Sequence, residues 1–284
     1  MGSLGGVTRF SFKTAQQQTS WQNLVEFWRV GDSIDVFDAG WAFDHFYPLG
    51  ASPTEPCLEG WTTLAGLARE TQRVRMGLMV ASNTYRHPAV HANIAATLDH
   101  ISGGRLEFGF GAGWFEDEHG AYGIELPALT ERFDRFDEAI EIIDSLLSRP
   151  ETTFAGEHYR LDAARCEPKP LQSPRPPIVI GGQGEKRTLR TAARWADQWN
   201  YPGYDPEDFR RKNAVLEDWC SELGRDATAI ERSIQVRFAG DPAELEDHVG
   251  RCLEAGVDHV IVYFAPPHDP GLLEPAAAVL RQFA

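Results

Sequence analysis

Short apolar runs alternate with longer amphipathic segments along almost the whole chain. In the longer segments apolar residues recur every three or four positions, as on one face of a helix. The run VRMGLMVA (74–81) is almost entirely apolar, as expected for a strand buried on both faces. The predicted strands are 7–12, 38–43, 74–81, 105–111, 176–182, 197–200, 232–238 and 259–264. The predicted helices are 20–31, 60–71, 88–101, 130–148, 184–196, 206–222, 242–255 and 271–283.

Eight strand–helix repeats define the expected fold class. They predict an α/β protein with one domain over residues 1–284, a single (β/α)8 TIM barrel. Helix starts are marked by Ser20 as an N-cap and by Pro88 in a first turn. Two segments exceed the minimal repeat, 112–129 after the fourth strand and 150–175 before the fifth. We interpret both as insertions at the rim of the barrel.

The net charge of −15 limits the partners that the protein can have. This field would repel a nucleic-acid backbone, and no apolar stretch is long enough to span a membrane. The segment MGSLGGVTRF lacks a basic region followed by an apolar one, so we expect no signal peptide. The four cysteines have neither metal-ligand nor disulfide spacing, so we expect no bound metal and a protein of the reducing cytoplasm.

In a barrel of this kind the active site lies at the carboxyl ends of the strands. The second strand ends in Asp44 and His45, which form either a polar loop or a proton-handling pair at the mouth. The acidic cluster 116–119 has no recognised ligand spacing, and we interpret it as a solvated loop. Other strands are followed by SNTYRH (82–87), GAGWFEDEHG (111–120), GGQGEKR (181–187), Asn200-Tyr201 and APPHD (265–269).

Two glycine-rich segments each allow two interpretations. GGQGEKR exposes backbone N–H groups ahead of a helix and carries two cations, which suits a phosphate, but an ordinary β–α turn has the same pattern. GFGAGW (109–114) is either a tight strand exit or a flat surface that lets a planar ring approach closely. The residues alone leave both questions open.

Five motifs together resemble the bacterial-luciferase-like oxidoreductases, and most closely their F420 (deazaflavin)-dependent branch. The resemblance spans roughly residues 9–264. It implies a barrel that binds F420, or FMN as the alternative, together with a small-molecule substrate, and it suggests a homodimer. The motifs are WAFDHF (41–46), NTYRHPAVHANIAATLDHISGGRLEFGFGAGW (83–114), EHGAYG (118–123), PKPLQSPRPPIVIGGQGEKRTLR (168–190) and ADQWN (196–200).

The resemblance assigns roles to individual residues. His45 would supply a proton beside the reactive ring carbon, and Asp44 would orient that imidazole or contact the ring. Met79-Val80 matches the place where the family has a non-proline cis peptide that supports one face of the ring. The remaining cofactor contacts implied are Ser82, Ala112 and Gly113 at the ring edge and ribityl chain, and Gly181, Gly182, Gly184 and Glu185 in the phosphate-binding turn.

One departure from the family bears on the substrate. Trp114 stands where the sugar-phosphate dehydrogenases of the family have a catalytic glutamate, so we do not predict a glucose-6-phosphate dehydrogenase. We expect Trp41, Trp114, Tyr47 and Tyr85 to line a pocket for a small apolar or aromatic substrate. The predicted activity is hydride transfer between F420 and that substrate, with reduction of the substrate as the expected direction. The alternatives are an FMN-dependent monooxygenase, a non-catalytic flavin-binding protein and an unrelated barrel enzyme that acts on a phosphorylated metabolite.

Overall fold

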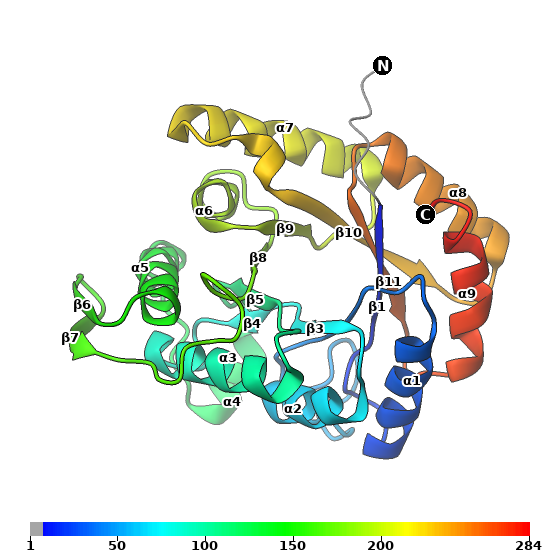
Figure 1. Ribbon diagram of the computed structural model, residues 1–284, viewed down its shortest axis with the longest axis horizontal. Coiled ribbons are helices and arrows are strands. Elements are labelled where there is room, and N and C mark those ends of the chain that lie inside the picture. The colour runs from blue at the N-terminus through cyan, green and yellow to red at the C-terminus, as the bar shows by residue number, and fades with distance from the viewer. Residues whose placement is uncertain (1–7) are drawn as a thin grey trace.

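A nearly closed barrel of parallel strands forms the centre of the protein, and helices surround it (Figure 1). The computed structural model describes residues 8–284, so Val7 of the first predicted strand and most of the segment that argues against a signal peptide lie outside it. The strands follow the order β3-β2-β1-β11-β10-β9-β8-β5-β4. They are β1 (Arg9–Lys13), β2 (Ala39–Ala42), β3 (Arg75–Leu78), β4 (Ala81–Ser82), β5 (Phe108–Gly111), β8 (Ile178–Gly181), β9 (Gln198–Tyr201), β10 (Glu231–Phe238) and β11 (His259–Phe264).

The third predicted strand, 74–81, is wrong as a single element. It is divided into β3 and β4 at Met79-Val80, whose peptide bond is cis, as the resemblance implied. The described chain therefore has nine barrel strands where the sequence predicts eight. The two ends of the sheet meet through one bridge between Met76 and Leu106, where Glu107 N donates to the carbonyl of Met76 at 2.8 Å.

The helices cover the outside of the barrel, and their starts follow the caps expected from the sequence. The Ser20 hydroxyl accepts from the backbone of Asn23, and Pro88 lies in the first turn of its helix. The helix predicted from residue 184 begins four residues later, because a glycine-rich turn comes first. The helices are α1 (Trp21–Ser33), α2 (Gly60–Glu70), α3 (Pro88–Ser102), α4 (Glu116–Tyr122), α5 (Leu129–Ser148), α6 (Thr188–Trp195), α7 (Pro206–Leu223), α8 (Pro242–Glu254) and α9 (Leu273–Leu280), with 3₁₀ turns η1 (Ala227–Ala229) and η2 (Pro270–Leu272).

The two segments that exceed the minimal repeat both contain regular structure. Segment 112–129 carries the short helix α4, and segment 150–175 carries an antiparallel hairpin of β6 (Thr152–Ala155) and β7 (Arg160–Ala164). The hairpin lies beside α5 (Figure 1), where the Glu138 carboxylate accepts from the backbone N–H groups of residues 157–159. No helix within residues 8–284 is long and apolar enough to cross a membrane.

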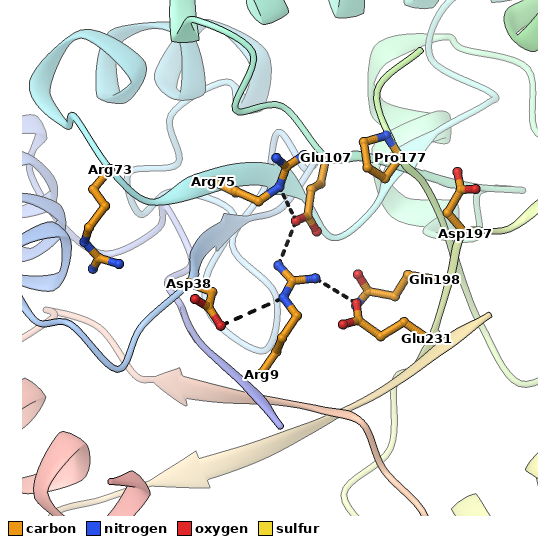
Figure 2. Close-up of a pocket in the computed structure, with 9 residues that line it drawn as sticks. All are labelled: Arg9, Asp38, Arg73, Arg75, Glu107, Pro177, Asp197, Gln198 and Glu231. Carbon is orange, nitrogen blue, oxygen red and sulfur yellow. Dashed lines mark hydrogen bonds and ion pairs between the residues drawn. The ribbon is translucent and has the colours of Figure 1, made fainter. Parts of the chain in front are cut away.

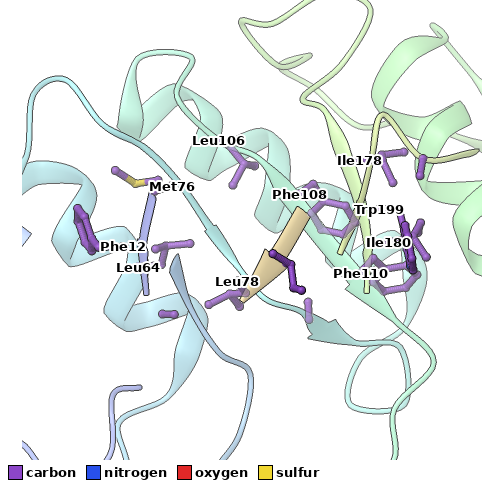
Figure 3. Packing of buried hydrophobic residues seen from close by; sticks show 14 of the residues in the cluster. Phe12, Leu64, Met76, Leu78, Leu106, Phe108, Phe110, Ile178, Ile180 and Trp199 are labelled. Atoms are coloured by element: carbon purple, nitrogen blue, oxygen red, sulfur yellow. The ribbon is translucent and has the colours of Figure 1, made fainter. Parts of the chain in front are cut away.

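The hydrophobic core has two parts. The larger part fills the space between the barrel and its helices; Figure 3 shows Phe108, Phe110 and Trp199 among its members. The smaller part lies inside the barrel and consists of Ala39, Trp41, Met79, Val179 and Ile261. Because neighbouring residues of a strand face opposite sides of a sheet, the inward positions of each strand stack in layers along the barrel axis.

Polar layers lie on either side of this apolar layer. Toward the amino ends of the strands, Ser11 Oγ is 2.6 Å from His259 Nε2, and Gln198 bonds the other ring nitrogen of His259. At the amino end itself, Arg9 donates to both Glu107 and Glu231 at 2.8 Å (Figure 2). Toward the carboxyl ends the layer consists of Lys13, Asn200 and Gln235.

Candidate active site

His45 lies at the carboxyl end of the barrel, directly after β2. Its Nδ1 donates to Glu118 Oε2 at 3.0 Å, and its side chain is 12% exposed. The other ring nitrogen, Nε2, bonds no protein atom that the structure describes. Because a carboxylate on Nδ1 fixes the orientation of the ring, Nε2 is the nitrogen available to take or give a proton.

Glu118 is a candidate functional residue that the sequence interpretation missed. The prediction of a solvated acidic loop over 116–119 is wrong, because this segment is part of α4 and the Glu118 side chain is fully buried. Its carboxylate accepts from the backbone N–H groups of Phe46 and Tyr47 at 2.6 and 2.7 Å and from the Tyr85 hydroxyl. Burial alone would raise the pKa of Glu118, but the hydrogen bonds from His45, Tyr85 and Tyr47 lower it below its usual value.

A helical pattern in the sequence could have revealed this orientation. Phe115, Glu118, His119 and Tyr122 follow the i, i+3, i+4, i+7 spacing of one helix face. Three consecutive acidic residues hid the pattern, although only the last of them points inward. His119 is buried as well, and its Nε2 lies 2.8 Å from the Thr84 hydroxyl.

Asp44 forms different contacts from those expected of a residue that orients His45. Its buried carboxylate forms two hydrogen bonds with Arg86, at 2.7 and 3.0 Å, and accepts from the backbone of Ser82 at 3.0 Å. The suggestion that Asp44 orients the imidazole is therefore corrected, since Glu118 bonds His45. Contact of Asp44 with the coenzyme ring stays a prediction. Asp44 instead fixes the segment after β4, which brings Ser82 beside the mouth of the barrel.

Aromatic rings surround His45. Phe43, Trp114 and Phe115 lie with their ring centres 5.2, 5.7 and 5.6 Å from the imidazole. Trp114 is 58% exposed, so an exposed apolar surface lies beside His45. The structure thus brings together His45 and one of the four residues predicted to line a substrate pocket.

The other three predicted pocket residues make no contact with the His45 ring in the described part of the chain. Tyr85 packs against Phe46 and bonds Glu118, and Tyr47 packs against Tyr122 of α4. Trp41 is fully buried in the apolar layer inside the barrel. Contact of these three residues with a substrate stays a prediction.

The glycines of β5 and β8 accommodate the side chain of Val80. A Cβ added at Gly111 or Gly181 would lie 2.7 or 2.8 Å from a Val80 methyl carbon, closer than any side chain can pack. Gly113 has a positive φ of 84° and turns the chain between Ala112 and the aromatic pair that borders His45. The glycines of GFGAGW therefore have structural reasons to be there, whether or not a ring also packs on them.

The predicted phosphate turn follows β8. Gly182 has a φ of 133°, and its carbonyl accepts from the Trp199 indole at 2.8 Å. Arg187 bonds Asp134 and Asp137, so its charge is already neutralised, and Glu185 is paired with two cations of α7, Arg211 and Lys212. Gly181, Gly182, Gly184 and Glu185 all stay predicted contacts, and an anion held here would depend on backbone N–H groups and Lys186.

Comparison with known proteins gives a consistent result. The luciferase-like monooxygenase family matches residues 4–281. An F420-dependent glucose-6-phosphate dehydrogenase of Microbacterium testaceum (strain StLB037) is 32% identical over 238 residues, which cover 82% of this chain and 69% of that protein.

Two solved structures show how widely the fold is shared. An F420-dependent secondary alcohol dehydrogenase, solved in complex with an F420-acetone adduct, is similar with a TM-score of 0.85 at 18% identity over 98% of both chains. A long-chain alkane monooxygenase is similar with a TM-score of 0.83 at 14% identity, over 98% of this chain and 92% of that one. At these identities the likeness establishes the fold and leaves the reaction to be argued from the site.

Proposed function

The chain belongs to the luciferase-like monooxygenase family, and on that premise we propose that it is an F420-dependent oxidoreductase acting on a small apolar or aromatic substrate. The relatives whose names contain F420 support the coenzyme. The direction we propose is reduction of an activated double bond. His45 is the proton donor, and Glu118 is the residue that holds it in place.

The geometry of His45 carries this proposal. A hydride delivered to a substrate carbon leaves the neighbouring heteroatom in need of a proton, and an imidazole can supply one near neutral pH. His45 Nε2 bonds no described protein atom, while Nδ1 is held by a buried carboxylate. The same arrangement of base and orienting carboxylate occurs in many enzymes that move a proton.

The residues at the mouth fit a tricyclic deazaflavin. Trp41 and Met79 form an apolar floor for the faces of a ring, and Lys13 offers a cationic donor to its carbonyl edge. Asn83 follows directly on Ser82, and its Oδ1 is buried without a partner in the described part of the chain. When bound, F420 supplies a hydride, and the protein provides orientation and the proton.

The aromatic side chains around His45 support an apolar or aromatic substrate. Trp114 and Phe115 place aromatic rings beside His45, so the phosphate of a sugar phosphate would meet no cation on this surface. Desolvating an apolar molecule against these rings is favourable by about 25 cal/mol per Å² of buried surface. For this reason the substrate of the glucose-6-phosphate dehydrogenase relative is not proposed here.

A titration of the purified protein with F420 and with FMN, each oxidised and reduced, tests the coenzyme. We expect F420 to bind at micromolar or lower concentration and FMN to bind at least about tenfold more weakly. The reverse preference would overturn the proposal in favour of a flavin monooxygenase, an activity that this fold also allows, since a long-chain alkane monooxygenase shares it. Binding of neither would leave only the family and the fold.

A further inference from the structure

Lys13, the last residue of β1, carries a positive charge into the mouth of the barrel. Its neighbour Phe12 packs outward against Trp28 of α1, with ring centres 5.1 Å apart, so the alternation of the strand turns Lys13 inward. The Lys13 ammonium donates to Gln235 Oε1 at 2.9 Å and lies 6.0 Å from the centre of the Tyr263 ring. A single lysine therefore lies in the polar layer directly above the apolar floor.

The charge of Lys13 is not balanced locally. Within residues 8–284 it forms no ion pair, and burial lowers the pKa of its ammonium to about 8. A position that serves only the fold would favour an apolar side chain here, because an enclosed cation loses hydration without compensation. Gln235 is fixed by its own bond to Asn200 at 3.3 Å, so its carbonyl stays directed at the lysine.

The strand register sets Lys13 close to the expected position of the coenzyme ring. Lys13 is paired with Trp41 on β2, and Trp41 shares the apolar layer with Met79. Met79-Val80 is the predicted platform for the ring. The ammonium is therefore placed to contact a ring edge that extends across the floor toward β1.

We propose that Lys13 binds the pyrimidine edge of the reduced coenzyme and makes the site prefer reduced over oxidised F420, an inference that rests on the proposed function. When the deazaflavin is reduced, its C5 gains a hydride, and the added electron pair is shared with N1 and the C2 oxygen. With N1 unprotonated, this edge is an anion, and a fixed ammonium stabilises it far more than it stabilises the neutral oxidised ring.

The consequence for turnover follows from the balance of the reaction. As the C5–H bond breaks and a new C–H bond forms on the substrate, the coenzyme is oxidised and the substrate is reduced. His45 gives its proton to the substrate heteroatom. A coenzyme held as the N1 anion has no proton to lose at that step, so Lys13 keeps the donor in the form that releases hydride most readily.

The test compares Lys13→Met with Lys13→Arg. Methionine keeps the length and fills the layer without the charge, whereas arginine keeps the charge. We expect Lys13→Met to raise the Kd of reduced F420 by about tenfold or more, with the Kd of oxidised F420 changed by less than about threefold. Lys13→Arg should retain most of the preference. Lys169→Met, a lysine that bonds the carbonyl of Leu146 on the outer face, is the matched control and should leave both constants unchanged.

The outcomes separate this inference from the proposed function. An equal loss of affinity for both redox forms in Lys13→Met would assign the residue a purely structural role and overturn the inference, as would an unchanged ratio of the two constants. In both cases F420 binding by the native protein would leave the proposed function standing. Failure of the native protein to bind either form would overturn both.

Discussion

The two ends of the barrel differ in how completely their charged groups are paired. At the amino end, in a cavity of about 470 Å³, the buried Glu107 accepts from Arg9 and Arg75, and Arg9 also pairs with Glu231 (Figure 2). At the carboxyl end Asp44 is paired with Arg86, but Lys13 forms no ion pair within residues 8–284, and His45 Nε2 bonds no described protein atom. Charges that satisfy one another stabilise the fold, while charges left available can act on a ligand.

This difference predicts which substitutions should change stability and which should change turnover. Removal of the buried Glu107 carboxylate would take from Arg75 its ion-pair partner and from Arg9 one of its acceptors. A histidine on the rim can be replaced with little structural cost, because it contributes one hydrogen bond to a network that has others. Stability should therefore depend on the amino end, and turnover on the carboxyl end.

The largest effect is expected for His45→Ala. Loss of the proton donor should lower kcat by about 10²- to 10⁴-fold, because general acid catalysis contributes that much in enzymes. Coenzyme affinity and the melting temperature should change little. Stopped-flow oxidation of reduced F420 with a substrate found by screening, alongside a binding titration, measures both. Unchanged turnover would remove His45 from the reaction.

At the opposite end, Glu107→Ala should lower the free energy of unfolding by about 2–3 kcal/mol, because two partly buried arginines, Arg9 and Arg75, lose the acceptor that they share. Urea unfolding measures the change, and F420 binding by the folded fraction should be preserved. Glu70→Ala, which breaks the exposed pair with Arg29, is the control and should cost less than about 1 kcal/mol. Similar losses in both variants would contradict the contrast.

The sequence was most informative where local chemistry decides the structure. Alternating apolar runs predicted the barrel, and Ser20 and Pro88 marked true helix starts, because caps act on the adjacent turn alone. The break between β3 and β4 could not be read from periodicity, since an apolar run looks the same on both sides of it. It was anticipated only through resemblance to a family.

The site residues were predictable only where strand ends reveal them. His45 follows a strand directly, so its place at the mouth could be inferred. Lys13 was missed because polar residues that alternate along β1 suggest a solvent face, whereas in a barrel the inner face can be polar and the outer face packs on helices. Glu118 was missed because its partners, His45 and Tyr85, come from distant segments that only the fold brings together.

Glu118 links stability to function at the carboxyl end, and pH should reveal it. Its folded pKa lies below the ordinary value of 4.5, so its contribution is complete above that pH and is lost as the pH falls through the folded pKa. Glu118→Gln should therefore melt at a lower temperature than the native protein at pH 7, and the difference should shrink as the pH falls below 4.5 and vanish once the pH is below the folded pKa. Turnover at pH 7 should fall about tenfold, because the amide holds the imidazole less firmly.

Melting curves of the two proteins between pH 3 and pH 7 measure that difference. A constant difference across the whole range would mean that the carboxylate contributes through packing alone. Glu116→Gln changes an acid of the same helix that has no bond to His45 among the described contacts, and it should show neither effect.

The smallest effect should come from Trp114, which tests the apolar side of the mouth. Trp114→Ala removes an exposed indole that borders His45, and we expect KM for an aromatic substrate to rise about fivefold, equivalent to about 1 kcal/mol of lost apolar contact. Because the indole bonds neither Glu118 nor Lys13 in the described structure, kcat and coenzyme affinity should be nearly unchanged, and Trp114→Phe should restore most of the KM. A fall in kcat with KM constant would instead make Trp114 a support for the imidazole, and the aromatic surface beside His45 would then belong to the catalytic machinery and not to substrate recognition.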